Sequence, residues 1–192
     1  CEEALALAAK ALANADGQTA AKIAPIDSEI DQMERTIESL CLKLLLQQQP
    51  VARDLRQISA ALKMITDMER IGDQASDIAE IIGFLNGRIG TDAQYICQMA
   101  VAAMRMVTES VEAYVKRDVA MAEATIQHDD VVDDLFLKVK ESLIQMISEN
   151  PKDGEYALDL LMIAKYFERI GDHATNIAEW VVFSVTGVHE QG

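Results

Sequence analysis

The acidic residues of one pentapeptide, which occurs twice in the chain, have the spacing of a cation site. The segment 69–73 reads Glu-Arg-Ile-Gly-Asp and returns 99 residues later as segment 168–172. Residues four apart on a helix lie one turn above each other, so the Glu and Asp carboxylates of each copy converge. Two such charges repel each other unless something positive lies between them. The repeat therefore predicts two copies of one module, each with its own cation site.

A second set of paired aspartates supplies facing ligands. Asp27 and Asp31 are four apart, and so are Asp129 and Asp133, 102 residues later. If the two helices of each half face each other, four carboxylates meet, and an all-oxygen site of this kind suits Mg²⁺, Mn²⁺, Ca²⁺ or iron. The predicted ligands are therefore Asp27, Asp31, Glu69 and Asp73 in the first half, and Asp129, Asp133, Glu168 and Asp172 in the second.

Further acids could join these sites. Asp130 and Asp134 form a second pair, shifted by one residue from Asp129 and Asp133. The sequence therefore does not decide which of the two pairs faces the site. At 100° per residue, Glu80 and Glu179 lie on almost the same face of their helices as the repeated acids. Asp77 is a weaker candidate, because its counterpart in the second copy is Asn176. These additional candidates are Asp130, Asp134, Asp77, Glu80 and Glu179.

The same acids also have a simpler interpretation. Carboxylates four apart are common on solvated helix surfaces, and Arg70 and Arg169 could neutralise them as weak local ion pairs. The duplication favours cation sites, because the acidic pairs recur at matching positions in two diverged copies. Gly72 and Gly171 lie between the acids of each copy, although glycine inside a helix costs about 1 kcal/mol relative to alanine. We expect these glycines to allow close packing between helices.

The elements that position these acids are expected to be helices. Half of the residues are apolar and only 5% are aromatic, with three prolines to interrupt helices. Asp118 can cap one helix, and Thr91 with Gln94 forms a capping box for another. The expected helices span about 2–15, 19–48, 50–85, 91–117, 118–148 and 154–187.

The duplication divides these helices into two sets of three. Nine of the twelve positions in 69–80 are identical in 168–179, and Asp16 matches Asp118 at the offset of 102. The sequence therefore predicts an all-α fold of two tandem, pseudo-symmetric three-helix bundles, residues 1–87 and 91–192, packed about a pseudo-twofold axis. Because the chain opens with Cys1 inside a helical pattern, we expect the first bundle to start partway into the protein.

Composition excludes several classes of function. The formal net charge of −15 disfavours nucleic acid as a partner. No apolar run approaches the length of a membrane span, which is about 20 residues. Three widely spaced cysteines without a CxxC motif indicate a reducing cytoplasm. Glu-x-x-His near the acids, a glycine-rich phosphate loop and HExxH are all missing, which argues against catalysis, although a metal-dependent phosphohydrolase or oxidase stays open as an alternative.

Several segments resemble the PhoU family of phosphate-uptake regulators, over essentially the whole chain. Residues 50–56 read Pro-Val-Ala-Arg-Asp-Leu-Arg, residues 67–73 include the repeated Glu-Arg-Ile-Gly-Asp, and residues 176–180 read Asn-Ile-Ala-Glu-Trp. The second half lacks a copy of residues 50–56. The resemblance implies two three-helix bundles with spectrin-repeat-like packing, each with an acidic metal motif on two helices. Its ligands fall on the eight predicted carboxylates, and Fe, Mn, Mg and Zn stay open as the metal.

The resemblance also implies a regulatory role without catalysis. PhoU-like proteins restrain phosphate-starvation signalling and limit phosphate uptake by linking the ATPase subunit of a phosphate ABC transporter to a sensor histidine kinase. A homodimer in the cytoplasm, peripheral to the inner face of the membrane, is the corresponding expectation. A PhoU-like domain cut from a sodium–phosphate transporter is the remaining alternative.

Overall fold

The computed structural model describes residues 1–85, 87–88 and 93–188, and this part of the chain contains helices and turns but no β-strand. The all-α prediction is therefore confirmed. The helices are α1 (Glu2–Asn14), α2 (Gly17–Ala20), α3 (Ile23–Gln48), α4 (Arg53–Phe84), α5 (Gln94–Lys116), α6 (Val119–Gln127), α7 (Asp129–Glu149), the 3-10 helix η2 (Pro151–Asp153) and α8 (Gly154–Thr186).

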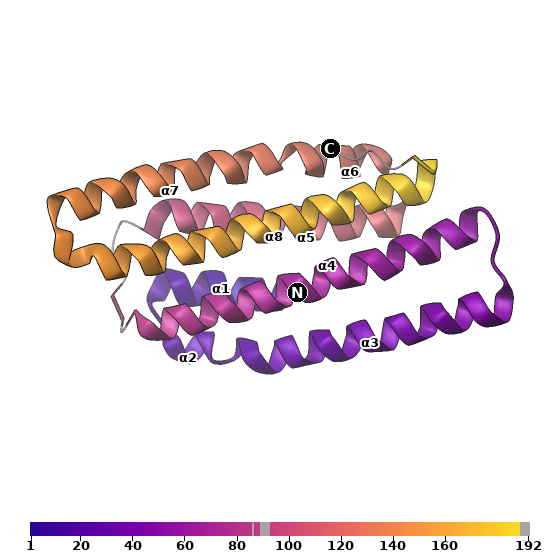
Figure 1. The fold of residues 1–192 in the computed structure, drawn as a ribbon, viewed down its shortest axis with the longest axis horizontal. Helices are drawn as coiled ribbons and strands as arrows, with labels where there is room; N and C mark the ends of the chain where they lie inside the picture. Colours follow the sequence, from indigo (N-terminus) through magenta and orange to yellow (C-terminus); the bar gives the residue numbers. More distant parts are fainter. Residues whose placement is uncertain (86, 89–92, 189–192) are drawn as a thin grey trace.

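The two longest helices, α4 and α8, lie side by side along the middle of an elongated molecule (Figure 1). They run in opposite directions, with α3 packed against α4 on one side and α7 packed against α8 on the other. The shorter α1 packs against both α4 and α5. One continuous hydrophobic cluster joins residues of both halves, including Ile71 and Ile78 of α4 and Ile170 and Ile177 of α8. Both acid-bearing helix pairs, α3 with α4 and α7 with α8, therefore belong to one packed body.

The turn before the second helix of each half is built in the same way. Ala15 and Arg117 adopt left-handed backbone conformations with φ of 52° and 56° and end α1 and α5. The next residue caps the following helix: Asp16 accepts a hydrogen bond from the backbone N–H of Gln18, and Asp118 from that of Met121. These residues are 102 apart, so the predicted cap at Asp118 and the duplication are both visible in the backbone.

Two of the expected helices are broken, and their prediction as continuous helices was wrong. The span 19–48 is divided into α2 and α3, and the span 118–148 is divided into α6 and α7 at His128. The first break lies just before Pro25, the third residue of α3, and proline is tolerated only in the first turn of a helix. The second break carries neither glycine nor proline. The short helices bury their own residues, Thr19 in α2 and Ala122 and Thr125 in α6, so tertiary packing overrides the continuous helical pattern.

The other helix ends agree with the sequence to within a few residues. The third expected helix begins at Arg53 rather than near Pro50, because Ala52 takes an unusual positive φ of 48°. Gly187 ends α8 with φ of 82°, as expected for a glycine stop. The predicted capping box at Thr91 lies outside the described residues.

Polar contacts between α4 and α8 reveal a pseudo-twofold relation. The amide of Asn176 donates a hydrogen bond to Asp67 Oδ1 at 3.1 Å, and Tyr166 donates one to the carboxylate of Asp77. At the offset of 99, Asp67 corresponds to Tyr166 and Asp77 to Asn176. Exchanging the two halves therefore converts one contact into the other, as expected for halves related by a pseudo-twofold axis.

Candidate metal centres

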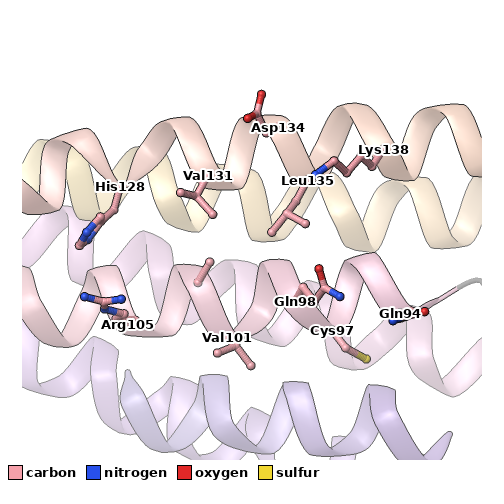
Figure 2. A pocket seen from close by; sticks show the side chains of 11 residues that line it. Gln94, Cys97, Gln98, Val101, Arg105, His128, Val131, Asp134, Leu135 and Lys138 are labelled. Carbon is pink, nitrogen blue, oxygen red and sulfur yellow. The ribbon is translucent and has the colours of Figure 1, made fainter.

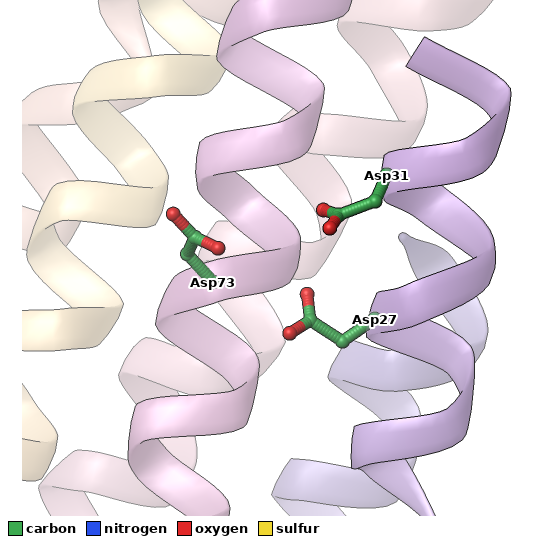
Figure 3. Close-up of side chains that lie close together, drawn as sticks. All are labelled: Asp27, Asp31 and Asp73. Atoms are coloured by element: carbon green, nitrogen blue, oxygen red, sulfur yellow. The ribbon is translucent and has the colours of Figure 1, made fainter. Parts of the chain in front are cut away.

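Three carboxylates converge between α3 and α4. Asp27 and Asp31 point from α3 towards α4, which carries Asp73 (Figure 3). One oxygen from each of these residues lies within 4.8 Å of one from each of the others. All three side chains are partly buried. This trio contains three of the four ligands predicted for the first half.

Gly72 allows α3 to approach α4 at this point. A Cβ atom on Gly72 would lie 2.9 Å from Asp27 Oδ1, closer than real Cβ contacts come, and an unusually tight 3.0 Å from Ile30 Cδ1. The same Asp27 oxygen is buried and accepts no hydrogen bond within the described part of the protein. Burial, followed by the charges of Asp73 and Asp31, raises the pKa of Asp27. A bound cation would satisfy this oxygen and neutralise the repulsion.

Glu69, the fourth predicted ligand, borders the trio and is held by Arg70. The Arg70 Nε atom lies 3.4 Å from Glu69 Oε2, and its Nη1 donates to Asp73 Oδ2 at 3.1 Å. Burial and the charge of Asp73 raise the pKa of Glu69, and the guanidinium of Arg70 counteracts them. Because Arg70 is more than half exposed, these ion pairs contribute little to stability.

The second half repeats the arrangement on α7 and α8. A Cβ on Gly171 would lie 3.2 Å from Asp129 Oδ1, which matches the contact of Gly72 with Asp27. Asp129 therefore occupies the position of Asp27, and the register that the sequence left open is resolved. Burial raises the pKa of Asp129 to about 6, and the charges of Asp172, Asp133 and Glu168 add to the shift. The four predicted acids of this half therefore act on one another electrostatically.

The second cluster differs from the first in two respects. Among the described residues, its aspartates do not form a trio as compact as that of Asp27, Asp31 and Asp73. The Lys165 ammonium forms an ion pair with Glu168 Oε2, and Glu168 is only 15% exposed. The sequence interpretation missed Lys165. Its spacing of three residues before Glu168 was the available signal.

The additional candidates lie around the clusters. Asp130 and Asp134 are exposed on α7, and Asp134 lines an apolar groove of about 860 Å³ between α5 and α7 (Figure 2). Asp77 accepts its hydrogen bond from α8, and Glu80 is exposed one turn beyond it. Glu179 is partly buried on α8, about two turns beyond Asp172.

His173 follows the predicted ligand Asp172 in the chain, but its imidazole contacts an acid outside both clusters. Its Nδ1 lies 2.9 Å from Asp67 Oδ1, across the boundary between the halves. Asp67 was not singled out from the sequence, because contacts between helices 106 residues apart leave no local spacing pattern. The imidazole and Asp67 therefore join α8 to α4.

The residues present fit a metal ion of the predicted kind. The donors are carboxylate oxygens, one of them is buried without a partner, and a glycine opposite that oxygen keeps the helices close. Hard cations such as Mg²⁺ and Mn²⁺ prefer such donors. Among the described residues, the side chains that converge closely enough to hold a metal ion are three aspartates and include no cysteine, so a thiolate zinc site does not fit here.

Comparison with known proteins identifies one family. The family model described as "PhoU domain" matches residues 1–82 and 96–181. A protein of Clostridium acetobutylicum named phosphate-specific transport system accessory protein PhoU homolog is 37% identical over 180 residues, which cover 93% of this chain and 82% of that protein. A Pseudomonas aeruginosa protein with the same name is 35% identical over 182 residues, 94% of this chain and 75% of that protein.

Solved structures agree in fold. The crystal structure of PhoU from Pseudomonas aeruginosa matches with a TM-score of 0.93 at 34% identity, covering 97% of this chain and 90% of the other. The phosphate transport system regulatory protein PhoU from Streptococcus pneumoniae matches with a TM-score of 0.89 at 25% identity, covering 99% and 90%. In the described part of this chain, no helix combines the length and apolar character needed to cross a membrane.

Proposed function

We propose that this chain, which belongs to the PhoU family, is a metal-binding regulatory adaptor of phosphate homeostasis. Membership makes it an accessory protein of phosphate-specific transport, and its relatives are named as accessory or regulatory proteins, not as enzymes. The finer role is that it restrains phosphate-starvation signalling and limits uptake by linking a phosphate ABC transporter ATPase to a sensor histidine kinase.

The convergence of Asp27, Asp31 and Asp73 is the observation that supports the metal-binding part of this proposal. Each half holds one metal ion or cluster between its two acid-bearing helices, with Fe, Mn, Mg or Zn as candidates. The metal neutralises carboxylates that otherwise repel each other, and so stabilises the acidic face that partners contact.

Metal content tests this part directly. Protein purified without chelator is expected to contain metal by elemental analysis. The double variant Asp27→Asn/Asp129→Asn is expected to lose most of it, because each change removes a carboxylate next to the helix-packing glycine. The matched control is Asp130→Asn/Asp134→Asn, which removes the same charge from exposed positions on α7. Equal metal content in both double variants would contradict the assignment of the sites.

Recovery of partners from membranes tests the adaptor role. Tagged full-length chain, incubated with membranes of the source cell grown with ample phosphate, is expected to retain a transporter ATPase or a histidine kinase, identified by mass spectrometry. This outcome also supports a location at the inner face of the cytoplasmic membrane and separates the adaptor from a metal-dependent hydrolase. If neither partner is enriched over the Asp27→Asn/Asp129→Asn variant and over a tag-only sample, the adaptor role is wrong.

A further inference from the structure

We infer that the second half of the chain tunes the metal site of the first half, through the hydrogen bond that Tyr166 of α8 donates to Asp77 of α4. Tyr166 is a positioning residue in this scheme. It holds the Asp77 carboxylate beside the α3–α4 site, and the carboxylate in turn attracts the cation. The inference rests on the proposed function, since it concerns the affinity of a site whose occupancy is itself proposed.

Asp77 lies next to the three converging aspartates of the first half. It follows Asp73 by four residues on α4, so the two carboxylates leave the same face of the helix one turn apart. The side chain of Asp77 is partly buried. Its negative charge reaches the trio, because it adds to the effects of burial, Asp73 and Asp31 that raise the pKa of Asp27. Asp77 is therefore placed to attract a cation that Asp27 binds.

Two residues of α8 act on Asp77 from the opposite half. The phenol of Tyr166 donates to its carboxylate, and both side chains are partly buried where α4 and α8 lie side by side. Burial raises the pKa of Asp77, the hydrogen bond from Tyr166 is the largest effect that lowers it, and the exposed guanidinium of Arg169 lowers it further. Without the phenol, the desolvated carboxylate loses its neutral donor and turns towards water and Arg169, where solvent screens its charge.

The arginines of the first half, Arg70 and Arg35, do not take over this role. They pair with the three other acids of the site, and both side chains are more than half exposed. Among the described residues, neither arginine is paired with Asp27, whose Oδ1 atom is buried without a hydrogen-bond partner. The charge of Asp77 therefore acts on the part of the site that these cations leave unneutralised.

The second half has an amide in place of this carboxylate. At the offset of 99, Asn176 corresponds to Asp77, and Tyr166 corresponds to Asp67. There the amide is the donor and the acid is the acceptor, at 3.1 Å. The position one turn beyond Asp172 is thus neutral, so the second site lacks a counterpart of the control that we assign to Tyr166.

Single-site variants test the inference with Mn²⁺ as the probe. The full chain, stripped of metal by chelator and then dialysed, is titrated with MnCl₂ in a calorimeter. Asp129→Asn leaves only the first site, and Asp27→Asn leaves only the second. In the Asp129→Asn background, Tyr166→Phe is expected to weaken Mn²⁺ binding about fivefold, the effect of one hydrogen bond. In the Asp27→Asn background it should change binding by less than about twofold, although Tyr166 is only two residues from Glu168, a predicted ligand of the second site.

A double-mutant cycle shows whether Tyr166 acts through Asp77. In the Asp129→Asn background, Asp77→Asn should also weaken Mn²⁺ binding, and a further Tyr166→Phe change should then weaken it by less than about twofold. A tyrosine that only maintains packing would give effects that add. Tyr114→Phe is the matched control, because it removes the hydroxyl of another partly buried tyrosine, on α5, and should bind like its background.

The outcomes are distinguishable. Weaker binding at the first site, which disappears in the Asp77→Asn background, supports the inference. Unchanged or tighter binding at the first site, a larger effect at the second site, or additive effects overturn it while the metal-binding function stands. Absence of Mn²⁺ binding by the wild-type chain contradicts the proposed function itself, and the inference with it. Circular dichroism and urea unfolding of the metal-free variants separate altered binding from altered folding.

Discussion

Gly72→Ala is expected to destabilise the protein by about 1–3 kcal/mol, although alanine is the better helix former. The added Cβ would lie 2.9 Å from Asp27 Oδ1 and 3.0 Å from Ile30 Cδ1, so these two side chains must shift. A shift of the Asp27 carboxylate moves one of the three converging oxygens out of place. Urea unfolding of metal-free protein measures the loss of stability, and Mn²⁺ titration measures the accompanying loss of metal binding.

Two other glycines provide controls for this prediction. A Cβ on Gly83 of the same helix would meet no atom of another element within 4 Å, so Gly83→Ala should stabilise the protein by about 0.5–1 kcal/mol. Gly171→Ala should be close to neutral, because its nearest contact is a milder 3.2 Å and helix propensity gains about 1 kcal/mol. Equal effects of all three changes would mean that close packing at Gly72 does not limit the approach of the helices.

The metal-free protein is expected to become more stable as the pH falls from 7.5 to 5.5. Asp129 has a pKa of about 6 in the folded protein against 3.8 ordinarily, so in this range the folded state binds more protons than the unfolded chain. Stability therefore decreases as the pH rises through about 6, and the change between pH 5.5 and 7.5 is at most about 1 kcal/mol, because solvent screens this partly exposed carboxylate. The acids that face Asp129 are Asp130 and Asp133 on α7, with Glu168 and Asp172 on α8.

Asp129→Asn should reduce this pH dependence and stabilise the metal-free protein at pH 7.5, since an amide carries no charge to be repelled. Urea midpoints at the two pH values, with chelator present, give the measurement. Asp134→Asn, on the groove between α5 and α7, should retain the wild-type slope. A metal-free wild type that is less stable at pH 5.5 than at 7.5 would show the opposite sign and refute the explanation. Added Mn²⁺ should stabilise the wild type more than Asp129→Asn.

The all-helical fold and the spacing of the acids could be predicted because both leave local patterns in the sequence. A Glu and an Asp four apart define one face of a helix, and a second copy of the pattern shows that the spacing is not accidental. The close approach at Gly72 and Gly171 could be anticipated for the same reason, since glycine inside a helix needs an explanation.

Other features depend on packing between distant segments and could not be predicted. The break at His128 follows from the way in which α6 packs against α8, and no residue near it disfavours a helix. The contact of His173 with Asp67 joins residues 106 positions apart. The choice between Asp129 and Asp130 required the contact with Gly171, because both aspartates fit the sequence spacing.

The crossing of α4 and α8 has a consequence for how the protein evolved. In an ancestor with one module per chain, a symmetric pair of chains would make each contact of this crossing twice, and any mutation would change both at once. Two modules in one chain are free of that constraint. The Asp67–Asn176 and Asp77–Tyr166 contacts occupy equivalent positions but use different donors, an amide and a phenol. A single chain can thus keep the paired geometry while its two halves specialise.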